Sequence, residues 1–432
     1  RDITGKAILF ALYRQAARMG CDVLHGCTAI KLLGGPSQIN GVLAFDWFHG
    51  TWIPILGKST VVATGGGGCL FYRTSNPPGS TGDGIWVAFD AGAELMDLEF
   101  IQFYPVNYVY PPSLVGRNVG SYGETRLLNS KMERFMQKYD PERLENTTRD
   151  LLARAIYTEL KEGRGTEHGG VFIDRTGLPD AYYARFPQEL QLCLERGLDI
   201  RTTMAEVAPA AHYFCGGIKI NCKTQTNAGG LFAAGEVAAG IHGANRLANN
   251  SLTDALVFGF IAGEEAWQYA LGCRVSSKDK QNTLREAKAY ILHYTKKIQQ
   301  ISGNKSGETI LSMKNRISKL MWEKVGVVRE HQELQDAVNV LENLVNEWPC
   351  MVKYETSANK NILTLAIFEL ESMVNVAYLI ALTALTRKES RGTHYRCDFP
   401  YEDDTLWRCN IVLHKKGDSN GFATSFVQPG RG

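Results

Sequence analysis

Apolar residues in the first part of the chain follow helical spacing in one place and strand spacing in several. Residues 6–19 form an amphipathic pattern that predicts a helix. Residues 21–33 alternate between apolar and polar side chains, as a strand does, and residues 41–55 predict two short strands. The β-branched run at 58–63 predicts a further, buried strand. This part of the chain is therefore expected to combine helix and sheet.

The pattern changes near residue 277, where strand spacing gives way to helical spacing that continues to residue 386. Within this region one apolar stripe recurs every three or four residues, which indicates a helix face packed in a core rather than a cofactor site. The stripe consists of Met313, Ile317, Leu320, Met321 and Val325. The C-terminal end is rich in glycine and is expected to be loose.

A strand, a loop and a helix follow one another between residues 230 and 269. Ser251, with Asp254 three residues later, predicts a helix N-cap and an acidic first turn. A helix N-terminus carries unpaired N–H groups and a partial positive charge, so it favours an anion. Arg246, in the preceding loop, adds a planar donor fork suited to a carboxylate. An ordinary strand–loop–helix unit with an exposed arginine remains open on these residues alone.

Two glycine-rich segments follow predicted strands or open predicted helices. The strand at 58–63 ends in Thr64-Gly-Gly-Gly-Gly68, where bare backbone can approach a ligand closely. Thr81-Gly-Asp-Gly84 precedes a predicted helix at 85–91 and is expected to cap it. A flexible turn explains the first segment equally well, and a capping role explains Asp83.

Composition narrows the class of protein but not its chemistry. A chain of 432 residues is long enough for two or three domains with their own cores. Its content of 44% hydrophobic and 21% charged residues is typical of a soluble globular protein. The net charge of +2 gives no indication of a nucleic-acid partner. We therefore expect no nucleic-acid binding.

The cysteines argue against a disulfide framework or a metal site, and the longest apolar run argues against a membrane span. None of the ten cysteines forms a Cys-x-x-Cys pair, so we expect reduced thiols and no metal site. The best membrane candidate, residues 362–386, is interrupted by Glu369 and Glu371. We therefore expect no direct membrane span and no signal peptide.

One long motif carries a family resemblance. Gly235-Glu-Val, then His242-Gly-Ala-Asn-Arg-Leu247 and Asn250-Ser-Leu252, resembles the flavoprotein subunits of succinate dehydrogenase and fumarate reductase, and the related L-aspartate oxidases. The resemblance implies that Glu236, Ser251 and Leu252 hold FAD and that Arg246 binds a substrate carboxylate.

Further segments match the same family along nearly the whole chain. Thr64-Gly-Gly and Thr81-Gly-Asp-Gly resemble segments near FAD, which implies cofactor contacts for Gly65, Gly66 and Asp83. Arg149-Asp-Leu-Leu-Ala-Arg resembles the segment whose first arginine is the proton donor and acceptor, so Arg149 is the expected catalytic residue. His212-Tyr-Phe-Cys-Gly-Gly-Ile218 resembles the segment whose histidine binds substrate. A hydrogen-bonded helix-terminal arginine and a core histidine are the structural alternatives.

Two positions depart from the family pattern. Tyr104 stands where the family usually has a dicarboxylate-binding histidine, and a phenol donates one hydrogen bond but carries no positive charge. The family also carries a Thr-Glu-x-x-Arg segment, whose glutamate and arginine relay protons to the catalytic arginine. Its positions are Arg117, Asn118 and Ser121 here, although Glu124 and Arg126 lie close by. The usual proton route is therefore not present.

The resemblance implies an α/β fold with a glutathione-reductase-like FAD-binding domain, incomplete at the N-terminus, an inserted α+β capping domain and a C-terminal helical domain. The FAD-binding domain is expected at 1–105 and 226–272 and the capping domain at 106–225. The helical domain follows at 273–386 and a C-terminal segment at 387–432. Arg149, His212 and Arg246 are expected to converge on one cavity with Tyr104 on its wall.

The implied function is FAD-dependent hydride exchange with a C4 dicarboxylate, as in fumarate reductase or succinate dehydrogenase. An iron–sulfur or other electron-transfer subunit is the expected partner. The implied location is cytoplasmic, or peripheral at the inner face of a membrane through such partners. An L-aspartate oxidase is the close alternative, for which Glu124 would bind the substrate ammonium. A non-catalytic scaffold subunit with the FAD fold is the alternative from another class.

The beginning of the chain carries one further expectation. No Gly-x-Gly-x-x-Gly precedes the helix at 6–19, although FAD diphosphate binds at such a turn. The sequence therefore predicts a truncated chain that holds FAD weakly. It also predicts that the apolar faces of residues 6–19 and 58–63 lie open.

Overall fold

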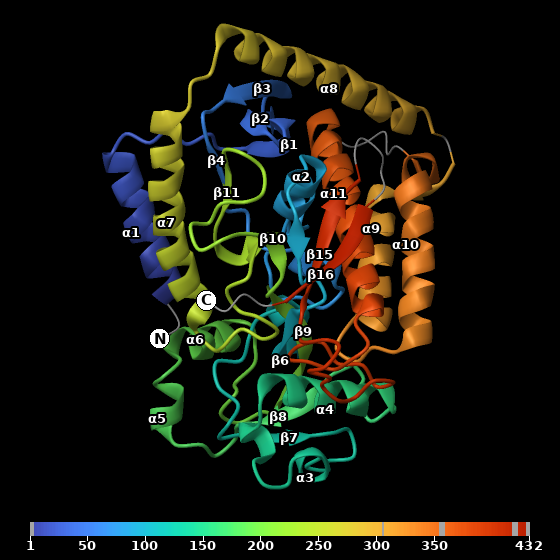
Figure 1. Cartoon of the computed structure of the whole chain (residues 1–432). Coiled ribbons are helices and arrows are strands. Elements are labelled where there is room, and N and C mark those ends of the chain that lie inside the picture. The colour runs from blue at the N-terminus through green and yellow to red at the C-terminus, as the bar shows by residue number, and fades with distance from the viewer. Residues whose placement is uncertain (1–3, 305, 354–358, 417–421, 429–432) are drawn as a thin grey trace. The chain divides into compact units, whose positions relative to one another are not determined.

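The computed structural model describes residues 4–304, 306–353, 359–416 and 422–428. The chain divides into two compact units, each made of discontinuous segments. Unit 1 comprises Arg1–Leu24, Arg73–Asn76 and Phe103–His212. Unit 2 comprises His25–Tyr72, Pro77–Gln102 and Tyr213–Gly432. Figure 1 shows the elements of both units, coloured from blue at the N-terminus to red at the C-terminus.

Unit 1 is built on a four-stranded sheet of order β6-β9-β8-β7. Strands β7 and β8 pair antiparallel, as do β8 and β9. The strands are β6 (Ile101–Tyr110), β7 (Arg126–Leu128), β8 (Val171–Asp174) and β9 (Ala205–Phe214). Valine and isoleucine on these strands face a core with Leu152 and Ile156 of the helix α4 (Arg149–Lys161). Unit 1 thus combines an antiparallel sheet with a helix that packs on it.

The other elements of unit 1 are short, apart from the N-terminal helix. They are α3 (Met136–Tyr139), α5 (Asp180–Tyr183), α6 (Pro187–Glu195) and the 3₁₀ turns η2 (Pro112–Leu114) and η3 (Leu144–Asn146). Helix α1 (Thr4–Arg18) confirms the helix predicted near residues 6–19, but none of its residues is buried. Leu9, Leu12 and Met19 are all more than half exposed. The expected open apolar face is therefore observed.

The described residues of unit 2 form four separate sheets, and two of them contain the predicted strands of the first part. An antiparallel sheet holds β1 (Cys27–Gly35), β2 (Gln38–Asp46) and β3 (Thr51–Leu56). A parallel pair joins β4 (Thr60–Val62) to β11 (Leu231–Ala233). Only Val62 of β4 is buried and Val61 is exposed, so the strand predicted as buried is short and half open.

The five-stranded sheet of unit 2 has the order β12-β10-β5-β15-β16. Its strands are β5 (Leu95–Met96), β10 (Gly217–Lys219), β12 (Ala238–Ala239), β15 (Asn410–Lys415) and β16 (Phe422–Val427). Strand β16 pairs with β15 along six residues, from Phe422 to Val427. The expectation of a loose C-terminal end was therefore wrong for this segment, whose alternating Phe-Ala-Thr-Ser-Phe-Val pattern suits a strand.

Helices α2 (Asp83–Asp90) and α7 (Asn250–Gly272) belong to the same unit, with the 3₁₀ turns η1 (Gly68–Leu70) and η4 (Gly235–Val237). The predicted N-cap at Ser251 was wrong: the helix starts at Asn250 and its cap is Asn249, with a left-handed φ of 68°. Similarly, the cap of α2 is Gly82 with φ of 82°, and no side chain caps that helix. Helix termini predicted from sequence commonly move by one or two residues.

The helical region confirms the spacing read from residue 277 onwards. It contains α8 (Ser277–Gly303), α9 (Ile310–Lys324), α10 (His331–Met351) and α11 (Lys360–Thr386), with the small β13 (Glu308–Thr309) and β14 (Val352–Lys353). Helices α9, α10 and α11 lie side by side (Figure 1). Met313, Ile317, Met321 and Val325 of the predicted stripe are fully buried.

Helix α11 shows that the chain does contain an apolar helix of membrane length, which was not expected from the sequence. It is the one helix among the described residues that is long and apolar enough to cross a membrane, with a mean hydropathy of 1.7. Of its most apolar stretch, 61% is buried within the protein. Glu369 and Glu371 pair with Lys314 and Lys297 of neighbouring helices. Burial of this kind is what the central helix of a soluble bundle shows.

Candidate functional site

The expected proton donor and one expected substrate ligand lie on the same tyrosine ring in unit 1. Arg149 is the first residue of α4, and its guanidinium carbon lies 5.1 Å from the centre of the Tyr104 ring. The ring of His212, on β9, lies 5.3 Å from the same ring at an angle of 48°. The positive end of the α4 dipole adds to the charge of Arg149, so this cluster attracts an anion.

The side chain of His212 is oriented by a short segment of the same unit. Its Nδ1 lies 2.8 Å from Ser75 Oγ, and Asn76 Nδ2 donates a hydrogen bond of 3.1 Å to its carbonyl. The backbone of Ser75 donates to Ala211, the neighbour of His212, over 3.0 Å. These bonds hold one side of the imidazole and thereby fix the direction of the other nitrogen.

Tyr104 is buried, and its hydroxyl donates a 2.7 Å hydrogen bond to the carbonyl of Val119. Burial is the main cause that raises the pKa of this phenol. A second tyrosine, Tyr122, meets the Tyr104 ring edge-on at 6.0 Å. Tyr104 therefore offers its ring, rather than its hydroxyl, to Arg149 and His212.

In unit 2, the expected carboxylate ligand Arg246 is only 4% exposed. Its Nη2 donates to Gln102 Oε1 over 2.7 Å, and Gln102 Nε2 donates back to the Arg246 carbonyl over 2.8 Å. Asn245 Oδ1 accepts a second bond from the same amide at 2.7 Å. The amide of Gln102 thus fixes both the backbone and the guanidinium of the Arg246 loop.

Beneath Arg246 lies a group of three hydrogen-bonded side chains. The guanidinium carbon is 4.5 Å from the centre of the Tyr213 ring. The Tyr213 hydroxyl lies 3.0 Å from both His242 Nε2 and Asp254 Oδ2, and those two atoms are 3.1 Å apart. Burial, followed by the charge of Asp254, raises the pKa of Tyr213. The three groups hold the ring on which Arg246 rests.

Glu236 is a partly buried carboxyl beside a glycine that leaves room for it. Its Oε1 accepts the backbone N–H of Phe214 at 3.0 Å. A Cβ added at Gly66 would lie 2.4 Å from that oxygen, so only glycine fits without a shift. Burial raises the pKa of Glu236 to about 7, while the Phe214 N–H and the charge of Arg246 lower it. Glu236 is therefore poised to change charge near neutral pH.

Asp83 and one of the two predicted glycines, Gly66, line a cavity of about 260 Å³ within unit 2. Its walls include Thr28, Thr64, Gly66, Thr81, Asp83 and Gly84. Gly65 adopts a left-handed φ of 76° at the start of this segment. Burial raises the pKa of Asp83 to about 6, although the Thr81 hydroxyl donates to it. Bare backbone and small polar groups at this wall fit the polar portions of a dinucleotide such as FAD.

Ser251 and Leu252 lie in the first turn of α7, one and two residues after its start at Asn250. Their backbone N–H groups belong to the unpaired set that every helix start presents. The side chain of Leu252 is exposed. The expected cofactor contact through this helix start therefore depends on backbone groups, because the helix has no side-chain cap.

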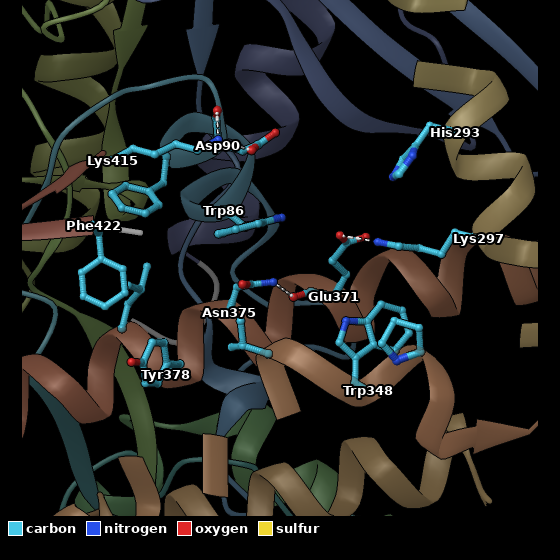
Figure 2. A pocket seen from close by; sticks show the side chains of 14 residues that line it. Trp86, Asp90, His293, Lys297, Trp348, Glu371, Asn375, Tyr378, Lys415 and Phe422 are labelled. Carbon is cyan, nitrogen blue, oxygen red and sulfur yellow. Dashed lines mark hydrogen bonds and ion pairs between the residues drawn. The ribbon is translucent and has the colours of Figure 1, made fainter. Parts of the chain in front are cut away.

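A second cavity, of about 360 Å³, lies among the helices of unit 2 and contains none of the expected site residues (Figure 2). Trp86, Trp348 and Tyr378 supply its aromatic walls. Its charged groups pair with one another: Lys297 with Glu371 at 2.7 Å and Lys415 with Asp90 at 2.6 Å. A dicarboxylate would find no net positive charge there.

Several residues that support the expected site were not assigned roles from the sequence. Tyr122, Ser75 and Gln102 lie far along the chain from the side chains that they contact. The family motifs contain or adjoin His242, Tyr213 and Asp254. Nothing in their residue types or spacing predicts that these three side chains contact one another. Periodicity predicts which face of an element is buried, and does not predict such contacts.

Models of two protein families match this chain. The FAD binding domain matches residues 1–252, which is more than half of the chain. The C-terminal part of the fumarate reductase flavoprotein matches residues 314–427. Together they cover the α/β part and most of the helical part of the chain.

Curated relatives match over 96% of the chain and about three quarters of their own length. An uncharacterised FAD-dependent oxidoreductase of Methanocaldococcus jannaschii is 39% identical over 417 residues, covering 74% of that protein. One chain of the fumarate reductase (CoM/CoB) of Methanothermobacter marburgensis is 38% identical over 421 residues, covering 74% of it. An L-aspartate oxidase of a Nostoc species is 31% identical over 439 residues, covering 72% of it.

Solved structures show the same fold. The FrdA chain of E. coli quinol fumarate reductase superposes with a TM-score of 0.82 at 27% identity, covering 93% of this chain and 71% of that one. The Sdh1 chain of Mycobacterium smegmatis superposes with a TM-score of 0.81 at 31% identity, covering 96% and 70%. The predicted fold class is thereby confirmed.

Proposed function

The chain belongs to the FAD-dependent flavoprotein family of fumarate reductases and succinate dehydrogenases, and we propose that its substrate is a C4 dicarboxylate. Membership makes it an FAD-dependent oxidoreductase of the fumarate reductase or succinate dehydrogenase type. The scaffold alternative is therefore set aside. The identity of the substrate and the role of each residue are the proposal.

One observation carries the proposal: Arg149 and His212 share the Tyr104 ring. Two groups expected to act on one substrate, a proton donor and a carboxylate ligand, come together although they stand on different elements. A carboxylate gains charge-assisted hydrogen bonds from a guanidinium and from an imidazole N–H. Tyr104 contributes a surface for both side chains, because its own hydroxyl is bound to Val119.

We assign Arg246 as the anchor for a substrate carboxylate. The amide of Gln102 and the ring of Tyr213 hold its guanidinium in place. A buried, preorganised guanidinium binds a carboxylate without first having to be ordered. The same positive charge polarises an unsaturated dicarboxylate and prepares it for reduction.

Arg149 is assigned to move the proton. When bound, FAD supplies or accepts the hydride, and the substrate carbon that receives no hydride needs a proton. Arg149 can supply it because a guanidinium side chain carries several N–H protons. Asp83 and Gly66 are proposed to hold FAD because they line the glycine-walled cavity. Gly65, next to Gly66 in the chain, and Glu236, whose Oε1 lies against Gly66, are proposed to join them. Ser251 and Leu252 are proposed to contact FAD through the N–H groups of the helix start.

The proposal extends to partners, location and domains. Structural neighbours in the family come from quinol fumarate reductase and from an Sdh1 chain in complex with UQ1, so we infer that electrons are exchanged with a partner. We propose that this partner is an iron–sulfur or similar subunit and that the location is cytoplasmic, peripheral to a membrane where the partner is membrane-bound. We also propose that residues 106–225 act as the capping domain.

An L-aspartate oxidase is the second candidate, since relatives of that kind match the chain. Aspartate carries an ammonium group, which needs an available carboxylate in the site. The candidate for that role, Glu124, forms an ion pair of 2.8 Å with Arg185 and is half exposed. A carboxylate already paired in this way favours the dicarboxylate over the amino acid.

Steady-state turnover distinguishes the two candidates. The flavin-loaded protein is supplied with fumarate and reduced methyl viologen, and separately with L-aspartate and oxygen. We expect oxidation of the viologen that depends on fumarate and no peroxide from L-aspartate. Peroxide formation from L-aspartate without fumarate reduction would overturn the assignment.

A further inference from the structure

The proton that Arg149 gives away has to be replaced in every turnover, and the family's usual relay is missing here. Asn118 and Ser121 stand at the positions of the relay glutamate and arginine. The two nearby residues that could substitute are engaged elsewhere. Glu124 pairs with Arg185 at 2.8 Å, and Arg126 pairs with Asp174. The replacement has to come from another group beside Arg149.

Tyr122 is such a group. Its ring lies edge-on to Tyr104 at 6.0 Å, and Arg149 lies over the face of Tyr104 at 5.1 Å. Both side chains therefore contact the same ring, and the positive charge of Arg149 lowers the pKa of Tyr122 against the larger effect of burial. Asp150, the carboxylate that follows Arg149 in the chain, is paired with Arg154 at 3.0 Å.

The chemistry of a phenol suits this position. A free phenol has a pKa near 10 and a guanidinium one above about 12, so a phenol is the stronger acid of the two. A proton therefore moves downhill from a phenol to a guanidine that has just lost one. Tyr122 is only partly buried, so water reaches it, whereas the hydroxyl of Tyr104 is bound to Val119.

We propose that Tyr122 returns the proton to Arg149 in each turnover, in place of the missing glutamate and arginine. The inference rests on the function proposed above. The Arg149 guanidinium loses a proton to the substrate carbon as the C–H bond forms. The Tyr122 O–H then breaks and its proton restores the guanidinium. The phenolate takes a proton from water and leaves hydroxide, so both charge and protons balance.

The test compares Tyr122 with Tyr182, a tyrosine of helix α5 whose hydroxyl contacts the residue before Tyr122. Tyr122→Phe removes the proposed relay hydroxyl. Tyr182→Phe is the matched control, because the Tyr182 hydroxyl donates to the carbonyl of Ser121 at 2.7 Å and so supports the residue next to Tyr122. Both variants lose one phenol near the same segment, but Tyr122 lies against the ring that carries Arg149, whereas the Tyr182 hydroxyl is bound to Ser121.

Fumarate turnover is measured for the flavin-loaded full chain, together with malonate binding by calorimetry. We expect Tyr122→Phe to lower kcat by about 100-fold, the lower end of what acid–base assistance contributes. The KM for fumarate and the malonate affinity should stay within about twofold, and the solvent deuterium isotope effect on kcat should rise. The control should keep kcat within about threefold, since it loses one ordinary hydrogen bond.

Two results would overturn the inference. Equal losses of kcat in both variants, with an unchanged isotope effect, would show that Tyr122 only supports the loop, while the proposed function would stand. A wild-type protein that binds flavin but neither binds malonate nor reduces fumarate would remove the proposed function and the relay with it.

Discussion

The two arginines proposed to act on substrate are held in opposite ways. Arg246, in unit 2, is 4% exposed, hydrogen-bonded to Gln102 and stacked on a tyrosine that two further side chains fix. Arg149, in unit 1, is partly exposed at a helix start and lies over Tyr104. One guanidinium is immobilised within the protein, and the other lies where water can reach its surroundings.

This difference corresponds to two chemical tasks. A residue that only binds a carboxylate gains from rigidity, because no ordering is required when the ligand arrives. A residue that gives up and regains a proton needs a neighbour that can exchange protons with solvent. Rigid support should therefore govern affinity at Arg246, and proton access should govern rate at Arg149. Variants of the two residues should therefore differ in which quantity they change.

The largest effect is expected at Arg149. Arg149→Ala should lower fumarate turnover by about 10³-fold, the scale on which loss of a general acid acts. The flavin spectrum should be unchanged, because the expected FAD contacts lie elsewhere. Arg201→Ala is the control, since that arginine lies in the same unit, is half exposed and pairs with Asp199 at 2.8 Å. Turnover that survives in Arg149→Ala would remove this residue from the chemistry.

A smaller effect, on affinity, is expected at Arg246. Arg246→Ala should weaken malonate binding by about 10- to 100-fold, which corresponds to one charged hydrogen-bonded contact. Arg246→Lys should recover only part of the loss, because an ammonium cannot replace the planar fork. Calorimetric titration provides the measurement. If Arg246→Ala changes kcat but not malonate affinity, Arg246 acts in the chemical step and is not the anchor for a substrate carboxylate.

The carboxyl of Glu236 should make stability depend on pH. Its pKa is raised to about 7 from 4.5, mainly by burial, so the folded protein holds the proton more tightly than the unfolded chain. The associated stability is complete below pH 4.5 and is lost as pH rises through about 7. The loss is on the order of 3 kcal/mol.

Urea unfolding at pH 5 and at pH 8 checks this expectation. In Glu236→Gln the difference in unfolding free energy between the two pH values should shrink relative to the wild type, because the amide does not titrate. An unchanged difference in the variant would mean that Glu236 is ionised in the folded protein at both values.

The smallest effect is expected at Tyr213. Tyr213→Phe keeps the ring under Arg246 but removes the hydroxyl that lies 3.0 Å from His242 and Asp254. The free energy of unfolding should fall by about 1–3 kcal/mol, the cost of depriving a buried carboxylate of a partner. Malonate affinity should fall severalfold. Tyr269→Phe is a comparison, because that hydroxyl bonds to Gln38 in the same unit. If Tyr213→Phe lowers the free energy of unfolding but leaves malonate affinity unchanged, the Tyr213 hydroxyl does not support carboxylate binding by Arg246.

Patterns with a strong period predict the structure well. The stripe of Met313, Ile317 and Met321 is buried as expected, because a helix has to bury its apolar face. The long motifs around Arg246 and His212 indicate the family. They can do so because a set of particular residue types at fixed spacing occurs in few protein families, whereas apolar periodicity occurs in most.

Predictions fail where tertiary contacts decide. The two glutamates within residues 360–386 argue against a membrane-length helix, but they pair with lysines and leave the apolar length intact. The sequence favours Ser251 as the cap of its helix, but Asn249 tolerates the left-handed conformation that ends the loop. The contacts of Tyr122 and Tyr213 join residues far apart in sequence, and no local pattern encodes them.

Single-turnover reoxidation tests the proposed dicarboxylate chemistry most directly. The flavin-loaded protein is reduced with dithionite under anaerobic conditions and then mixed with fumarate in a stopped-flow instrument. We predict that the oxidised flavin absorbance returns with wild-type protein and stays bleached in Arg149→Ala. If fumarate leaves the wild-type flavin reduced while a later addition of oxygen restores its colour, a C4 dicarboxylate is not the substrate of this protein.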